Sequence, residues 1–127
     1  MDDFICLGTG KIGKDYPVFI IAEVGVNHNG DLQTAKKLIK EAAHAGADCV
    51  KFQTFKAERV VTKDAPKAQY QLKTTAVDES QEAMLKKLEM DLESYRAIID
   101  CCKQHDVLFI STPYNTEDVD FLEELDA

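Results

Sequence analysis

Three short apolar runs divide the sequence, and polar side chains follow the end of each run. The runs cover residues 18–22, 49–53 and 107–110. Apolar runs without regular alternation of apolar and polar positions are typical of strands that are buried on both faces, as in parallel sheets. The first run stops at Glu23. Because α/β proteins build active sites where strands end and helices begin, this pattern indicates an enzyme.

Helical periodicity separates these runs. Between residues 31 and 45, apolar residues share one face at i, i+3 and i+4 spacing, and Gly46 can end this helix. Asp91 can cap a second helix that runs to about His105, and Asn115 or Thr116 can cap a third. The predicted order is strand, helix, strand, long insert, helix, strand, helix. It indicates an α/β fold with a parallel sheet.

Two further segments accompany this pattern. Residues 4–12 are predicted to form a hairpin around the turn Gly8-Thr9-Gly10, placed to close the N-terminal end of a barrel. The insert covers residues 56–88, and its end, residues 79–88, is predicted to be a short helix. A loop of this length is uncommon unless it is functional or disordered, and after a strand it would lie at the catalytic face.

The predicted units are too few for a closed (β/α)8 barrel, which needs eight strands and roughly 250 residues. We therefore interpret residues 1–127 as the N-terminal portion of a larger, incomplete domain. The alternative is a complete small α/β domain with three layers, or a module whose exposed sheet edges drive self-association.

Charge and composition exclude some partners. The formal net charge is −8, which argues against nucleic acid and anionic membranes as main partners. No apolar stretch approaches membrane-spanning length, and the first residues do not resemble a signal peptide. The four cysteines lack the spacing of a metal site or a disulfide framework. We therefore expect reduced cysteines and a cytoplasmic location.

Three motifs resemble successive signatures of the sialic acid synthase family, whose members make N-acetylneuraminate, legionaminate and pseudaminate. They are Ala-Glu-Val-Gly-Val-Asn-His-Asn-Gly at 22–30, Val-Lys-Phe-Gln at 50–53 and Phe-Ile-Ser-Thr-Pro at 109–113. Residues 70–74, 79–81 and 84–89 resemble the legionaminate-type synthases more than the sialate-type ones. The resemblance implies that the chain is the N-terminal three βα units of a TIM (β/α)8 barrel, preceded by a small β-hairpin.

The resemblance also implies a reaction. Family members join phosphoenolpyruvate to an N-acyl-mannosamine-type sugar, form a nonulosonic acid and release phosphate. They use a divalent manganese or magnesium ion, whose histidine ligands come from later strands, so this chain is expected to supply no metal ligand. A homodimer or larger homo-oligomer is expected. A different acceptor sugar is the alternative within the same chemistry, although the Asn27-His28-Asn29-Gly30 run argues against it.

Glu23 and Lys51 are the expected catalytic residues. A lysine inside a buried strand is costly unless it is paired, and the matching lysine of the family binds phosphoenolpyruvate. By resemblance, Glu23 faces the sugar and the attacking water. The structural alternative is an ion pair between Lys51 and Glu23, and the two roles are compatible.

Several other side chains are candidates for substrate binding. Gln53 can hold substrate oxygens or make a structural hydrogen bond. Thr112, or Ser111, can donate to phosphoenolpyruvate or serve the turn before the last helix. The remaining candidates are Asn27 and His28 on the rim loop and Tyr70 and Gln71 in the insert. For His28 the alternative is a satisfied structural group, and for Tyr70 and Gln71 it is a solvent-exposed loop.

Overall fold

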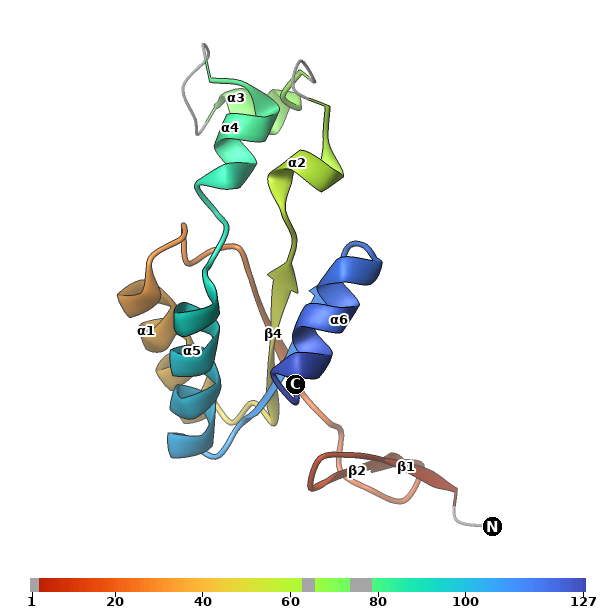
Figure 1. Cartoon of the computed structure of the whole chain (residues 1–127). Helices are drawn as coiled ribbons and strands as arrows, with labels where there is room; N and C mark the ends of the chain where they lie inside the picture. The colour runs from red at the N-terminus through yellow and green to blue at the C-terminus, as the bar shows by residue number, and fades with distance from the viewer. Residues whose placement is uncertain (1–2, 63–65, 74–78) are drawn as a thin grey trace.

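The computed structural model describes residues 3–62, 66–73 and 79–127, and a parallel sheet lies at its centre (Figure 1). The sheet has three strands in the order β3-β4-β5. They are β3 (Ile21–Gly25), β4 (Cys49–Thr54) and β5 (Leu108–Pro113). A helix lies in each crossover between neighbouring strands, as parallel pairing requires. The predicted α/β fold with parallel strands is confirmed.

Helices α1 (Leu32–His44) and α5 (Leu92–Gln104) lie side by side along the sheet (Figure 1). Apolar side chains from the strands and from both helices form the core, among them Val24, Ile39, Val50, Phe52 and Ile98. Helix α6 (Thr116–Glu124) packs against β5. Its Phe121 ring meets Tyr95 of α5 at a centroid distance of 5.1 Å, so the helices form one continuous layer.

The three long helices begin at residues that the sequence predicts as caps. The side chains of Asp31 and Asp91 each accept a hydrogen bond from a backbone N–H in the first turn, at 2.8 Å. For α6 the cap is Asn115 rather than Thr116, and its side chain accepts from the Asp118 backbone N–H at 3.2 Å. Gly46 follows α1 with φ +91°, the left-handed conformation that ends a helix.

The expected burial of the first apolar run on both faces is wrong. Val18, Ile20 and Ile21 are 85%, 52% and 44% exposed. Strand β3 begins at Ile21 and continues to Gly25, later than the apolar run suggests. The reason is that β3 is an edge strand, and within the described residues the helices cover one face of the sheet. Burial along β4 alternates accordingly, with Lys51 and Gln53 on the more exposed side.

The predicted hairpin is present. Strands β1 (Phe4–Leu7) and β2 (Gly10–Gly13) pair antiparallel, and Leu7 lies opposite Gly10. The hairpin lies at the end of the sheet where the parallel strands begin (Figure 1). Gly8, with φ +57°, packs so closely on Leu108 at the start of β5 that a Cβ would lie 2.5 Å from its side chain. The hairpin therefore sits away from the carboxyl ends of the strands.

The insert lies beyond the carboxyl end of β4 (Figure 1). It contains the predicted short helix as α4 (Gln81–Lys86), and it also contains two single-turn helices that the sequence does not predict, α2 (Ala57–Val60) and α3 (Gln69–Leu72). Glu89 ties its two ends together, because it accepts from the Ala57 backbone N–H at 2.7 Å. No helix in the described ranges is long and apolar enough to cross a membrane.

Candidate active site at the carboxyl ends of the strands

The structure brings Lys51 and Glu23 together. They occupy paired positions on β4 and β3, and Lys51 Nζ lies 3.0 Å from Glu23 Oε2. The expected ion pair is therefore present, but the expected burial of Lys51 is wrong. The two side chains are 38% and 48% exposed, because this side of the sheet has no covering helix among the described residues. A half-exposed ion pair of this kind is open to a ligand.

A β-bulge directly after Glu23 shapes the rim of the site. The register shifts between Glu23 and Gly25, and Gly25 adopts a left-handed φ of +56°. A Cβ at Gly25 would lie 3.1 Å from Glu23 Oε1 and 3.5 Å from Gln53 Nε2. The glycine thus has a carboxylate that accepts and an amide that donates close beside it, where a side chain would crowd the carboxylate.

Gln53 and Thr112 extend the same face of the sheet. They are paired across β4 and β5, two pairs beyond the Lys51–Ile110 pair along the strands. Gln53 is half-buried and Thr112 is exposed. The Tyr114 hydroxyl donates to Gln53 Oε1 at 3.1 Å. Sequence reasoning missed Tyr114, although it directly follows the Ser-Thr-Pro run that marks the end of this strand.

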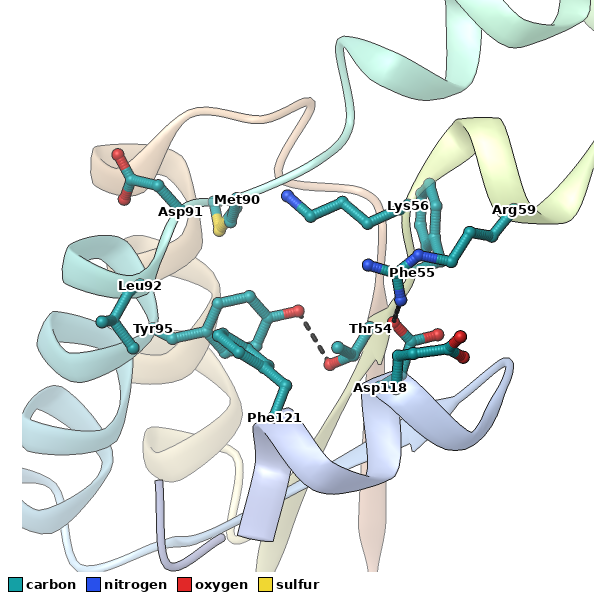
Figure 2. A pocket seen from close by; sticks show the side chains of 11 residues that line it. Thr54, Phe55, Lys56, Arg59, Met90, Asp91, Leu92, Tyr95, Asp118 and Phe121 are labelled. Carbon is teal, nitrogen blue, oxygen red and sulfur yellow. Dashed lines mark hydrogen bonds and ion pairs between the residues drawn. The ribbon is translucent and has the colours of Figure 1, made fainter. Parts of the chain in front are cut away.

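Ser111 points to the opposite side from Thr112. Its hydroxyl lies 2.7 Å from Thr54 Oγ1, and Thr54 Oγ1 lies 2.8 Å from the Tyr95 hydroxyl. Figure 2 shows the Thr54–Tyr95 hydrogen bond in the layer between the sheet and the helices. Burial raises the pKa of Tyr95, so this hydroxyl stays protonated. Of the two predicted donors, the structure places Thr112 beside Gln53 and Ser111 within a structural hydroxyl cluster.

A small cavity of about 90 Å³ borders this cluster (Figure 2). It is lined mainly by Thr54, Lys56, Arg59, Tyr95, Asp118 and Phe121. Its charged groups already have partners: Arg59 pairs with Asp118 at 3.4 Å, and Lys56 pairs with Glu89 at 3.6 Å. The cavity therefore lies among the groups that support the ends of β4 and β5.

Asn27 and His28 form the turn after β3 and do not join Lys51. The Asn27 side-chain amide donates to the Val24 carbonyl at 3.0 Å. His28 is 2% exposed, stacks on Phe52 and accepts from the Gly30 backbone N–H through Nδ1 at 2.8 Å. Burial lowers the pKa of His28, more than the neighbouring Asp31 raises it, so the ring is neutral. In this structure both side chains support the loop.

Tyr70 and Gln71 lie on α3, at the end of the insert far from the sheet (Figure 1). Tyr70 is 71% exposed. Gln71 Oε1 accepts from the Ala68 backbone N–H at 2.8 Å and thereby closes the start of α3. The structure therefore does not bring these two candidates to the Lys51–Glu23 pair.

The side chains of the site do not form a metal centre. Within residues 3–62, 66–73 and 79–127, no group of three or more His, Cys, Asp and Glu side chains is arranged to hold a metal ion. The cysteines in this part of the chain are free, and burial raises the pKa of Cys102 to about 12, which makes its thiol a poor ligand. What these residues can do is bind an anion at Lys51 and position hydroxyls with Glu23 and Gln53.

Comparison with known proteins points to the same family as the three sequence motifs. The chain is 58% identical over 106 residues to the N,N'-diacetyllegionaminic acid synthase of Campylobacter jejuni and 44% identical over 110 residues to that of Legionella pneumophila. These alignments cover 84% and 87% of the chain but 32% and 31% of the relatives, so the chain spans about a third of their length.

A solved structure of a related synthase is also similar to this chain. The sialic acid synthetase of Leptospira borgpetersenii, crystallised with citrate, superimposes with a TM-score of 0.77 at 32% identity. The match covers 96% of this chain and 38% of that one. The NeuB family model matches residues 38–127, which include the Lys51 strand and the Ser-Thr-Pro run. The resemblance predicted from the three motifs is confirmed, and the chain belongs to the NeuB family.

Proposed function

We propose that the protein is a phosphoenolpyruvate-dependent nonulosonic acid synthase, and that residues 1–127 are the N-terminal three βα units of its (β/α)8 barrel. The observation that carries the proposal is the half-exposed Lys51–Glu23 pair on the face of the sheet that the helices leave open. In a barrel this face would line the interior, and the carboxyl ends of its strands would carry the chemistry.

The proposed reaction joins two substrates through a carbon–carbon bond. C3 of phosphoenolpyruvate attacks the aldehyde carbon of an open-chain, N-acylated mannose-type sugar, whose oxygen takes a proton. Water adds to C2, and phosphate leaves by cleavage of its bond to C2. The names of the two legionaminic acid synthases support a product that carries two acetyl groups.

Lys51 is the proposed site for phosphoenolpyruvate. Its ammonium group binds the carboxylate or the phosphate, and charge-assisted bonds of this kind are the strong ones. Thr112 supplies a neutral hydroxyl near the same anion, since it lies two pairs further along the strands and on the same face of the sheet. Until the substrate arrives, Glu23 neutralises Lys51.

Glu23 has a second proposed role once phosphoenolpyruvate occupies Lys51. The freed carboxylate orients the attacking water or a sugar hydroxyl and can accept its proton. The Gln53 amide, which lies beside Gly25 as the Glu23 carboxylate does, supplies a donor. The divalent ion that the resemblance implies does not fit the described side chains of this chain, so we propose that residues elsewhere in the full-length protein hold it.

Phosphate release by the full-length protein tests the proposal. The protein is incubated with phosphoenolpyruvate, manganese and a panel of N-acylated mannose-type sugars, with and without a second acetamido group. We expect phosphate release that depends on the sugar and is fastest with the diacetamido sugar. Release without any sugar, or no release with every sugar, would refute the proposal.

A further inference from the structure

Among the described residues, the Gln53 side chain is held from one side. Its Oε1 accepts from the Tyr114 hydroxyl at 3.1 Å. Its backbone carbonyl accepts from the Tyr95 hydroxyl at 3.2 Å, which fixes the strand behind it. With Oε1 engaged, the amide group turns its Nε2, which carries two hydrogen-bond donors, away from Tyr114.

Tyr114 is itself well supported. Its ring packs edge-on against Phe55 at a centroid distance of 5.6 Å, and Phe55 is 8% exposed. Its backbone N–H donates to Asp118 Oδ2 at 3.2 Å. Asp118 is 3% exposed and pairs with Arg59, as Figure 2 shows beside Phe55. Tyr114 is 50% exposed, and these contacts restrain its ring and backbone so that the hydroxyl can hold Gln53.

The charge of Glu23 favours the same orientation of the Gln53 amide. Gln53 Nε2 and Glu23 Oε1 both lie beside Gly25, at 3.5 Å and 3.1 Å from the position that a Cβ there would take. The opposite amide orientation would turn the carbonyl oxygen toward the carboxylate and the NH2 group toward the Tyr114 hydroxyl. Two acceptors would then lie near each other beside Gly25, which is unfavourable.

We propose that Tyr114 is a positioning residue: its hydroxyl orients the Gln53 amide so that Gln53 Nε2 and Glu23 Oε1 together hold a hydroxyl group of the acceptor sugar. A hydroxyl accepts from the amide and donates to the carboxylate through a single oxygen atom. The oxygens of ionised phosphoenolpyruvate only accept, and Glu23 would repel them. This inference rests on the proposed function for the identity of the bound group.

A double-mutant cycle in the full-length protein tests the role of Tyr114. Tyr114→Phe keeps the ring against Phe55 and removes the hydroxyl. We expect KM for the sugar to rise about 2- to 10-fold, the range for a lost neutral hydrogen bond, with KM for phosphoenolpyruvate unchanged. In a Gln53→Ala background the same substitution should have no further effect. Tyr16→Phe in the loop after the hairpin is the matched control, and should leave both constants unchanged.

Tyr114→Phe kinetics equal to those of the unaltered protein would overturn the proposal, as would equal effects in the two backgrounds. A second measurement does not need activity. In protein labelled with ¹⁵N at glutamine, Gln53→Ala identifies the side-chain amide signals of Gln53, and Tyr114→Phe should shift them. Unshifted signals would refute the orientation by Tyr114. Shifted signals in a protein that releases no phosphate with any sugar would uphold the orientation and refute the proposed function instead.

Discussion

The attraction between Lys51 and Glu23 stabilises the fold only slightly, because both side chains are partly exposed to solvent. Exposed ion pairs contribute about 0–1 kcal/mol to the free energy of unfolding. An anion can therefore replace Glu23 at Lys51 with little loss in the free energy of unfolding. This property suits a pair whose partner is exchanged for a substrate.

We expect Lys51→Met in the full-length protein to weaken phosphoenolpyruvate binding and to reduce turnover, while the fold survives. Methionine keeps most of the volume of the side chain and removes the charge. Loss of such a charge-assisted contact costs roughly 2–5 kcal/mol, or about 30- to 5000-fold in affinity or rate. Steady-state kinetics with varied phosphoenolpyruvate measure both effects, and denaturant unfolding checks the fold.

Glu23→Gln is the matched comparison for this prediction. It should reduce turnover far more than phosphoenolpyruvate affinity, because the proposed partners of Glu23 are the sugar and water. If Lys51→Met leaves KM and turnover unchanged, the pair has only a structural role.

His28 predicts a pH dependence of stability. Its pKa in the folded protein lies below the ordinary value of 6.5 because the ring is buried. Below about pH 6.5 the unfolded chain therefore binds more protons than the folded one, and the free energy of unfolding falls as the pH falls. His28→Asn keeps an acceptor for the Gly30 N–H and should reduce this decrease in the free energy of unfolding. Denaturant unfolding at about pH 8 and pH 5.5 measures the decrease.

Exposed His44 provides the control for the pH experiment. His44→Asn should leave the difference between the two pH values as it is in the unaltered protein. If the free energy of unfolding falls equally between the two pH values in the unaltered protein and in His28→Asn, His28 is not the responsible group.

The insert docks on the rest of the chain through a few defined contacts. Glu89 joins its two ends, and Arg59 of α2 pairs with Asp118 at the start of α6. Gly30, in the turn before α1, lies so close to the carbonyl oxygen of Lys87 that any Cβ would collide with it. The glycine of the first sequence motif therefore serves the packing of an element far along the chain.

A pair of glycine substitutions isolates this docking contact. Gly30 and Gly46 both have a left-handed φ, +76° and +91°, so alanine strains both by about 1–2 kcal/mol. A Cβ at Gly46 meets nothing within 4 Å, whereas one at Gly30 meets Lys87. We expect Gly30→Ala to destabilise the protein more than Gly46→Ala. Only Gly30→Ala should increase amide hydrogen exchange across residues 81–90. Equal effects of the two substitutions would show that the insert does not depend on this contact.

At the scale of the whole molecule, the important feature is the sheet, which the described helices leave open on one face. Strands β3 and β5 are its outer strands within the described residues. Val18, Ile20 and Ile21 expose apolar side chains next to β3. Unpaired strand edges and exposed apolar patches promote association.

We therefore expect the isolated 127-residue chain to form dimers or larger assemblies and to release no phosphate from phosphoenolpyruvate. Light scattering over a range of concentrations measures the association. Val18→Lys should weaken it, because it places a charge beside the edge of the sheet. Ile5→Lys is the control, since Ile5 is 66% exposed on the hairpin, away from that edge. A monomer at all concentrations would favour a self-contained domain.

The sequence by itself determined the local structure of this protein. Caps, apolar stripes and the glycine turn of the hairpin act over a few residues, so α1, α5, α6 and the hairpin follow from neighbouring positions. The motifs also identified the family correctly, and the ion pair expected between Lys51 and Glu23 is present, while their catalytic roles stay predictions. Helices α2 and α3 were not predictable in this way, because each is a single turn whose N-cap position holds Lys56 or Ala68, which are not typical capping residues.

Only the tertiary structure decided which of the candidate side chains meet. Strand register placed Thr112 beside Gln53 and turned Ser111 toward Thr54. The bulge left the Glu23 carboxylate and the Gln53 amide close beside Gly25, and Tyr114 reached Gln53 from 61 residues away. Side-chain direction alternates along a strand, so pairing and bulges fix which side each residue takes. These long-range contacts leave no periodic trace in the sequence, which is why the orientation of the site required the fold.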